Sequence, residues 1–553
     1  MKSFFTRSTV WLLILLFAGY FGVYNVLRYQ TLHSAYFDLG IMHQTVYNTY
    51  RALITGEYGR ILELTDPHGS VNFMRAAVHV DLVMALFAGL YFINPSPATL
   101  VVAQAVIVAL GALAVYKIAL HLFEQYRMKY WLGTTFAFLY LMHPALQFMT
   151  IYDFHAVSIG TTTLLFFILY LFKKRYALAS MYFVLTILSK EQVALTTATW
   201  ALYVGYEALT RSVGSPRALL SHPKKLFKAL LRPSLRFPLF FAVASVVWFI
   251  LAVFVITPYY RGEGHFALER YGSFGSSPGG ILIGIFVRPM TIIQMLVDAE
   301  TLRYVLYLFG PYAFLPLLSP LTLLVMAPEF AINMLSNNPA MRGIQHHYTA
   351  ILHPTLIVGA MLGARRLLGY LSDAIIPYHL AHTKHHHNQF TPLKHVHQAR
   401  RNTILSNRLI RAMGVLIATI VCVFFSAWIG PLPYSMNAKT EAFETPTGPR
   451  QKVYEWQYKL KDENVRVSTT TSIAPFFSGR RYYYYFSPRY DDADYIVIMP
   501  SNITKHEYDP SDLVTPYNAL KKDARFMIID QGEDFEVYKK NAAPPLEYLP
   551  PVQ

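Results

Sequence analysis

The sequence predicts an α-helical polytopic membrane protein with about eleven transmembrane helices and a small C-terminal α/β domain outside the membrane. Hydrophobic residues make up 54% of the 553 residues and charged residues only 14%, whereas soluble domains carry about 25% charged residues. Apolar runs recur up to about residue 430, and residues 431–553 change to short alternating segments. This composition excludes a soluble enzyme, a disordered chain and a fibrous protein, because too few charges remain to cover a soluble surface.

The first apolar run, from Trp11 to Val26, is expected to be an anchored transmembrane helix. No small-residue cleavage site follows it, which argues against a removed signal peptide. Lys2 and Arg7 precede the run and predict a cytoplasmic N-terminus, because basic residues stay on the cytoplasmic side. Residues 30–80 then form the first extracytoplasmic loop.

The further spans follow from the alternation of apolar runs and basic loops. They are expected at residues 98–120, 131–149, 156–172, 176–206 (a hairpin of two), 237–257, 304–318, 321–335, 350–362 and 413–429. Segments 81–93 and 281–297 are expected at the membrane interface, because one is short for a span and the other is amphipathic. The loops assigned to the cytoplasm are basic, including a histidine-rich loop at 366–411. The sequence therefore predicts residues 1–430 as a multi-pass domain of the plasma (cytoplasmic) membrane.

The net charge of +16 does not indicate a nucleic-acid partner. Its basic residues lie in short loops between apolar runs, which is the positive-inside pattern of membrane proteins. The single cysteine, Cys422, lies within an apolar run. Neither a disulfide within the chain nor a thiolate metal site is therefore possible.

The C-terminal segment, 431–553, is predicted to be an extracytoplasmic α/β domain. Short strands are expected at 465–470, 481–486, 495–499 and 525–529, and helices at 453–460 and 511–521. The strands are short runs rich in aromatic and β-branched residues. The last predicted span leaves this domain on the outer side of the membrane.

Ionisable groups at the outer ends of the predicted spans are the candidate site residues, because such groups are costly near the membrane. The candidates are Asp38, His79, Asp153, His155, Lys190, Glu191, Arg270, Arg342, His346, His347 and Tyr348. Transfer from a phosphate-linked donor needs an acid that takes a proton from an acceptor hydroxyl. It also needs cations that hold the departing phosphate. The candidates supply both kinds of group.

Each candidate also has a purely structural interpretation. Asp38 could cap a helix that begins at Leu39, and Asp153 with His155 could cap the next span. Lys190 and Glu191 could form a local ion pair that holds the hairpin, and Glu329 could bond the backbone groups that Pro328 frees. His346 and His347 could be solvated loop residues. The histidines between 379 and 397 are interpreted as a solvated loop and not as a zinc site.

A divalent metal ion is the cofactor that these residue types would allow. Asp38, Asp153 and His155 include suitable ligand types, but no metal-ligand spacing is evident. The sequence contains no P-loop, no dinucleotide fingerprint and no G-x-S-x-G motif, which disfavours ATP-driven transport by this chain alone.

Phe37-Asp38-Leu39-Gly40-Ile41, with Gln44 and Asn48, resembles the opening motif of a bacterial and archaeal family of predicted membrane proteins, domain-of-unknown-function family 2079. Further matching motifs, in order, are His79, Asp153-Phe154-His155, Lys190-Glu191, Arg270-Tyr271, Asn333 to Tyr348, Phe477-Ser478-Gly479-Arg480 and Ala493-Asp494-Tyr495. The chain departs from the family after His79, where relatives have a small polar residue and proline, and at Gln192, where relatives often have an acid.

This family is similar in layout to the GT-C superfamily of membrane glycosyltransferases, which take sugar from a polyprenyl-phosphate carrier on the outer face. Their catalytic acid lies just after the first span, at the place of Asp38. The resemblance implies inverting transfer with Asp38 as the base. On this hypothesis we expect Asp153 and Glu191 to shape the site or hold a metal, and Arg342, with His346 or His347, to bind phosphate.

The implied partners are a lipid-phosphate sugar donor, membrane lipid and a glycan, lipid or protein acceptor. Two other classes of function remain open at this point. A transporter or lipid-carrier flippase would use polar groups at mid-membrane. A non-catalytic membrane scaffold would scatter the outer acids over separate surfaces.

Overall fold

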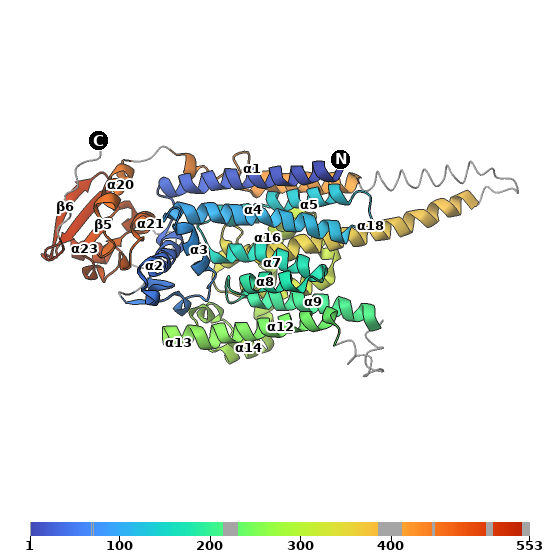
Figure 1. The fold of residues 1–553 in the computed structure, drawn as a ribbon, viewed down its shortest axis with the longest axis horizontal. Coiled ribbons are helices and arrows are strands. Elements are labelled where there is room, and N and C mark those ends of the chain that lie inside the picture. Colours follow the sequence, from blue (N-terminus) through green and yellow to red (C-terminus); the bar gives the residue numbers. More distant parts are fainter. Residues whose placement is uncertain are drawn as a thin grey trace.

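The computed structural model describes residues 2–67, 69, 71–213, 231–384, 412–444, 448–504 and 513–544. These residues form an elongated helical bundle with a small sheet domain at one end (Figure 1). Helix α1 (Lys2–Gln30) begins at the opposite end of the bundle and runs toward the sheet domain. The start of α1 and the C-terminal domain therefore lie at opposite ends of the molecule.

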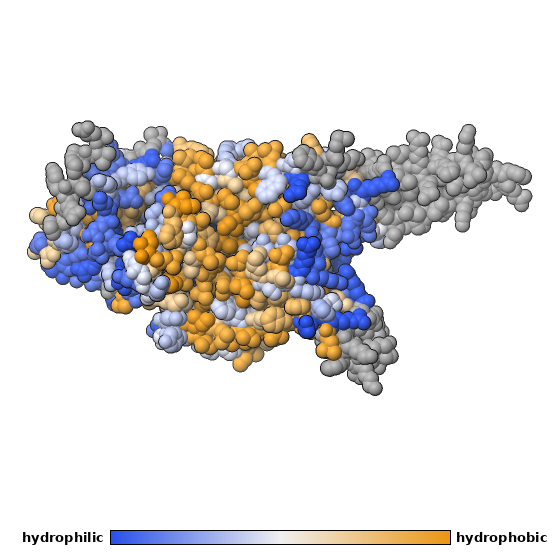
Figure 2. All heavy atoms as spheres, in the orientation of Figure 1, coloured by the Kyte–Doolittle hydropathy of each residue, from blue (hydrophilic) through white to orange (hydrophobic). Residues whose placement is uncertain are grey.

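Four helices are long and apolar enough to cross a membrane: Phe5–Gln30 within α1, α4 (Pro97–Leu122), Pro233–Arg261 and Ala412–Ile429. Helices α14 (Pro278–Val287) and α15 (Pro289–Val297) meet at 79° and add a fifth if the bent pair is one span. On the face shown in Figure 2, an apolar belt covers the middle of the bundle, with hydrophilic surface toward both ends. The chain is thus a helical membrane protein, and the individual count of eleven spans stays a prediction.

The span Pro233–Arg261 contains two α-helical parts. Helix α12 (Pro233–Leu251) and helix α13 (Thr257–Arg261) are joined by the π-helical turn η4 (Ala252–Ile256). Three shorter apolar helices are α7 (Ala156–Phe172), α8 (Tyr176–Ile187) and α17 (Pro320–Met334). The remaining helices of the bundle are α2 (Ile41–Thr55), α3 (Met84–Tyr91), α5 (Lys129–Met142), α6 (Pro144–Ile151), α9 (Val193–Val213), α16 (Ala299–Phe309) and α18 (Leu352–Lys384).

The predicted hairpin at 176–206 breaks where the sequence indicates. Helix α8 ends at Ile187 and α9 begins at Val193, so Lys190 and Glu191 lie between two helices. The span predicted at 350–362 was expected to end before Arg365 and Arg366. In the structure, α18 continues past them to Lys384. Arginine and leucine favour a helix, and a helix does not have to stop where the membrane ends. Residues 385–411 of the predicted histidine-rich loop lie outside the described residues.

The C-terminal domain contains a mixed five-stranded sheet in the order β4-β3-β5-β7-β6. Its strands are β3 (Val467–Thr469), β4 (Tyr483–Tyr485), β5 (Tyr495–Ile498), β6 (Phe526–Gly532) and β7 (Phe535–Lys540). Strand β3 runs parallel to β4 and β5, and β7 runs antiparallel to β5 and β6. All four predicted strand regions are present, and β7 was not predicted. Helices α20 (Pro449–Lys459) and α23 (Val514–Leu520) match the two predicted helices.

The C-terminal domain and the first loop share one hydrophobic core. The loop folds into the π-helical turn η1 (Tyr36–Gly40), α2 and a hairpin of β1 (Glu63–Thr65) and β2 (Asn72–Met74). Tyr36 of η1 stacks on Tyr485 of β4, with 5.2 Å between ring centroids. The C-terminal domain therefore fixes the turn that carries Asp38.

Candidate active site

One cavity of about 670 Å³ lies at the end of the bundle that faces the C-terminal domain. Seven of the predicted site residues line it: Asp38, His79, His155, Lys190, Arg270, His347 and Tyr348. The other four lie elsewhere. Asp153 and Glu191 are buried behind lining residues, and Arg342 and His346 line a neighbouring pocket. The structure thus brings most of the predicted groups together.

Asp38 lies in the turn η1, directly after the first membrane helix. The amide of Gly40 bonds the carbonyl of Ala35, five residues earlier, which makes this a π-helical turn. Such turns are frequent at functional sites. The Asp38 side chain does not cap a helix, so that interpretation is wrong. Its carboxylate instead accepts hydrogen bonds from the Tyr152 hydroxyl and from His155 Nε2, each at 3.0 Å.

Both ring nitrogens of His155 have a partner. Its Nδ1 lies 2.8 Å from the carbonyl oxygen of Asp153, which can only accept, so Nδ1 is the donor of that bond. Its Nε2 lies 3.0 Å from the Asp38 carboxylate. His155 thus links Asp38 to the backbone of Asp153.

The Asp38 carboxylate is held in its ionised form. Burial raises the pKa of Asp38, but the hydrogen bonds and charge of His155, the Tyr152 hydroxyl and the charge of Arg28 outweigh burial and lower it below the usual value. The side chain keeps 19% of its surface exposed toward the cavity. Asp38 can thus accept a proton from a bound hydroxyl.

His347 stacks on His155, with ring centroids 3.8 Å apart. Burial lowers the pKa of His347 well below the usual value, and the neighbouring charge of His155 lowers it further. The His347 ring thus packs face to face against the ring that contacts Asp38. The interpretation of His347 as a solvated loop residue is wrong, because its side chain is 8% exposed.

Asp153 contacts Arg28 and the backbone, and not the cavity. One carboxylate oxygen accepts from Arg28 Nη1, and the other accepts from the amide of Ala35 at 2.8 Å. Asp153 is 3% exposed. Its role is to hold the end of α1 and the start of η1. Sequence reasoning missed Arg28, although an arginine at the outer end of the first span departs from the positive-inside pattern.

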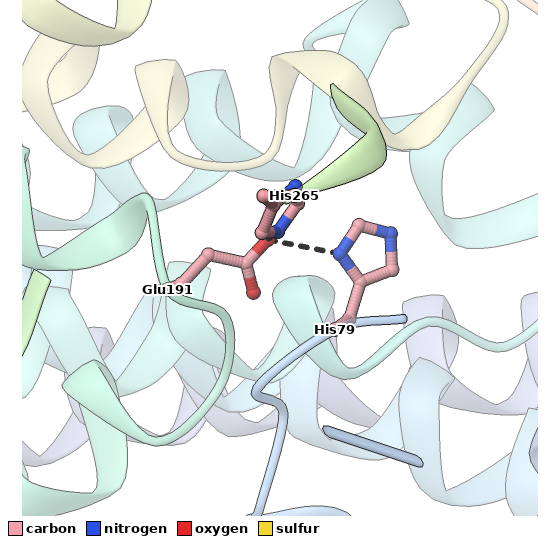
Figure 3. A group of neighbouring side chains, drawn as sticks. All are labelled: His79, Glu191 and His265. Carbon is pink, nitrogen blue, oxygen red and sulfur yellow. Dashed lines mark hydrogen bonds and ion pairs between the residues drawn. The ribbon is translucent and has the colours of Figure 1, made fainter. Parts of the chain in front are cut away.

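Glu191, His79 and His265 form a second acid–histidine cluster (Figure 3). Glu191 Oε1 accepts from His79 Nδ1 at 2.9 Å and from His265 Nε2 at 3.2 Å. Glu191 Oε2 accepts from the amide of Val80 at 3.0 Å. His265 lies directly before the 3₁₀ turn that contains Arg270, and no sequence pattern singled it out.

The charges of this second cluster follow from burial and from these bonds. Burial raises the pKa of Glu191, but His79 and His265 outweigh burial and place it well below the usual value. Burial lowers the pKa of His79 well below the usual value. A neutral His79 that donates through Nδ1 has an unprotonated Nε2. Because His79 lines the cavity, this nitrogen can accept a hydrogen bond from a substrate hydroxyl.

This cluster fits a hydrogen-bonded network better than a metal centre. The ligand atoms lie within 4.8 Å of one another. However, His265 Nδ1 accepts from the amide of Ala267 at 3.2 Å, so Nε2 is the nitrogen whose proton is donated to Glu191. That nitrogen has no free lone pair for a metal. Asp153 is 3% exposed and does not line the cavity, so it does not offer a ligand atom to a metal there.

Two of the predicted site residues, Lys190 and Arg270, are cavity cations available for an anion. Lys190 is 8% exposed and makes no ion pair or hydrogen bond through its ammonium with any residue that the structure describes. Burial lowers the pKa of Lys190. The guanidinium of Arg270 lies over the Phe266 ring at 5.5 Å, and no carboxylate of the described residues pairs with it. Arg75, in contrast, is paired with Asp81 at 3.0 Å.

Arg342 and His346 line a separate pocket of about 220 Å³. The His346 ring lies 5.2 Å from Tyr152, so this pocket adjoins the Asp38 cluster from the other side. Arg342 thus shares a pocket with His346, as predicted, but that pocket is separate from the cavity that Lys190 and Arg270 line. The chain crosses between the two pockets over residues 342–348, which separates residues that are close in sequence.

These features define a polytopic helical membrane protein with an acid–histidine cavity at one end. The chain belongs to the DUF2079 family of predicted membrane proteins, whose family model matches residues 28–523. No curated protein matches the sequence.

Several solved structures are similar to the chain. ArnT from Cupriavidus metallidurans bound to undecaprenyl phosphate has a TM-score of 0.44 and 12% identity, covering 97% of this chain and 99% of that one. The oligosaccharyltransferase AglB from Archaeoglobus fulgidus, in complex with an inhibitory peptide and a dolichol-phosphate, has the same TM-score and identity. That similarity covers 99% of this chain and 75% of AglB. Because the identity and the TM-scores are low, the conclusions about function rest on the side chains of the cavity.

Proposed function

We propose that the chain is a GT-C-like glycosyltransferase that moves a sugar from a polyprenyl-phosphate donor to an acceptor on the outer face of the membrane. The acceptor hydroxyl oxygen bonds to the anomeric carbon as the bond from that carbon to the lipid phosphate breaks. The bonding electrons leave with the lipid phosphate. The hydroxyl proton passes to Asp38.

The observation that carries this proposal is the shared cavity of Asp38, Lys190 and Arg270. An ionised carboxylate faces the same space as two cations that lack a carboxylate partner among the described residues. Such cations stabilise the negative charge that develops on a leaving phosphate. His79 Nε2 would accept from a hydroxyl of the sugar or the acceptor.

A lipid-linked donor is favoured by the surface beside the cavity. Arg270 lies in the 3₁₀ turn η5 (Phe266–Tyr271), and the next helix is α14. A side chain at Gly284 would collide with the carbonyl of Phe274, so α14 packs directly against the loop after η5. The outer side of α14 is apolar, and its Phe286 is 81% exposed. A lipid lying on α14 could bring its phosphate to Arg270.

The C-terminal domain would bind the acceptor or cover the cavity. It packs against η1 and α2, and Arg481 pairs with Glu63 of the first loop at 3.2 Å. The domain thus lies beside the Asp38 side of the cavity and away from α14 (Figure 1). Donor and acceptor would then approach Asp38 from different sides.

The first test of this proposal is transfer by purified protein in liposomes that contain polyprenyl-phosphate-linked sugars with a radioactive label. Asp38→Asn should lower the rate about a thousandfold, because the proton acceptor is lost while the shape is kept. Glu269→Gln, at the exposed rim of the same cavity, is the matched control and should keep the wild-type rate. Full activity of a folded Asp38→Asn protein would overturn the assignment of the base.

A second test asks whether the cavity binds a lipid phosphate at all. Undecaprenyl phosphate should raise the melting temperature of the wild-type protein and should raise that of Lys190→Met much less. If the labelled lipid instead crosses the bilayer with its sugar still attached, the chain is a transporter. If neither transfer, binding nor crossing occurs, the scaffold interpretation holds.

A further inference from the structure

A second large cavity, of about 760 Å³, lies at the opposite end of the bundle. Four separate segments contribute its basic side chains: Lys174, Arg211, Arg232, Arg365 and Arg366. They come from the α7–α8 connection, the last turn of α9, the start of α12 and the middle of α18. Because these side chains come from four different elements, they surround a space of defined shape. A single basic loop would not form such a space.

The balance of charge in this cavity is positive. Its acidic lining residues are Glu124 and Glu207. Glu207 pairs with Arg211 at 3.2 Å, and Arg366 donates to the carbonyl of Leu318 at 3.0 Å. Within the described part of the chain, Arg232 and Arg365 have no carboxylate partner. At least two guanidinium groups can therefore bind an anion, and guanidinium groups match phosphate geometry.

An apolar groove adjoins the basic cavity. It is a pocket of about 230 Å³ between α9 and α17, and Tyr203 lines both spaces. Leu202 on α9 and Leu324 on α17 line the groove and are 51% and 68% exposed. Apart from Thr199 and two tyrosines the groove lining is aliphatic, whereas the cavity lining contains the five basic side chains named above. An amphiphile could place its head in one and a chain in the other.

We propose that this cavity binds the phosphate headgroup of an anionic membrane phospholipid, with one acyl chain along the α9–α17 groove. Basic pockets between membrane helices bind such headgroups through arginine and lysine. The adjoining groove selects a lipid over a free anion, because it would bury an acyl chain. This site is independent of the glycosyltransferase proposal, since it lies at the other end of the bundle.

The test measures binding of a fluorescent phosphatidylglycerol to the purified full-length protein in a neutral detergent. Arg232→Gln combined with Arg365→Gln should weaken binding about 30-fold, because each basic residue near such a headgroup contributes about 1 kcal/mol. Both side chains are exposed, so their replacement removes no buried contact. The matched control combines Arg7→Gln with Lys129→Gln, which removes the same charge outside the cavity lining and should change binding less than twofold.

Three outcomes would overturn the proposal. Equal losses in both double variants would show that binding depends on diffuse surface charge. Equal binding of fluorescent phosphatidylcholine would show that the anionic headgroup is not recognised. Competition by inorganic phosphate as strong as competition by unlabelled phosphatidylglycerol would show that the ligand is a free phosphate and that the groove has no part in binding.

Discussion

Asp38 and Glu191 each pair with histidine beside the same cavity, but the two clusters differ in which partner is nearer to the cavity. In the first cluster the carboxylate is the more exposed partner, with 19% for Asp38 against 9% for His155. In the second the histidine is the more exposed partner, with 16% for His79 against 4% for Glu191. The same residue types therefore offer substrate a proton-accepting carboxylate in one place and an oriented neutral imidazole in the other.

The largest stability effect is expected from breaking the support of the first cluster. Arg28→Gln leaves the buried Asp153 carboxylate without its charge partner and should lower the free energy of unfolding by about 3–5 kcal/mol. Adding Asp153→Asn should recover part of the loss, because the uncompensated charge disappears. Thermal unfolding of the purified protein measures both values. Equal stability of the single and double variants would contradict a supporting ion pair.

Because Asp38 and Glu191 differ in their exposure to the cavity, we expect their substitution to change different kinetic parameters. Glu191→Gln keeps the shape of the side chain but weakens its hold on His79, and should raise KM about tenfold with little change in kcat. Asp38→Asn should lower kcat instead. Steady-state transfer kinetics with a polyprenyl-phosphate-linked sugar separate the two. A fall in kcat for Glu191→Gln as large as that for Asp38→Asn would mean that both acids take part in proton transfer.

A smaller effect on stability is expected from a change in pH. This effect tests whether His79 and His347 are neutral in the folded protein. Burial lowers the pKa of His79 and His347 in the folded protein, so below about pH 6.5 the unfolded chain binds more protons than the folded one. Stability should therefore fall as pH decreases from 6.5, by up to about 1.4 kcal/mol per pH unit for each histidine. Unfolding of wild type and His347→Asn between pH 8 and 5 tests this. An unchanged slope in His347→Asn would show that the folded protein protonates His347.

The smallest effect is expected from chelation. Hydrogen bonds already occupy the carboxylate oxygens of Glu191 and Asp153 and define the tautomer of His265. Treatment with a strong chelator should therefore leave transfer activity and the melting temperature unchanged. Loss of activity that returns on addition of one divalent metal would show that the second cluster rearranges to bind an ion.

The sequence predicted well which site residues lie close together. It predicted less well which of them line the cavity and which lie behind it. Asp38 and His155 follow the ends of apolar runs, so their common side of the membrane could be predicted from charge asymmetry. Glu191 lies behind His79 because segments distant in the sequence pack together. The pattern of apolar residues along the chain does not predict such packing. For the same reason Arg28 and His265 were missed, and the separation of the Arg342–His346 pocket from the Asp38 cavity was not predicted.

The fold shows a similar limit. The four predicted strand regions of the C-terminal domain have clear aromatic and β-branched runs, whereas β7 contains Glu536, Lys539 and Lys540 and reads as a polar segment. Its buried central residues become apparent only when β5 and β6 flank it. The helix break at Lys190 was predictable because polar residues interrupt an apolar run.

The contact between Tyr36 and Thr471 joins residues that are 435 positions apart. The ribosome adds about 5–20 residues per second, so the turn that carries Asp38 waits roughly 20–90 s for the segment that packs on it. During that interval the nascent chain has its first membrane helix but an unsupported first loop. Maturation of the cavity is therefore tied to synthesis of the last part of the chain, and partly synthesised molecules in the membrane have an incomplete cavity wall.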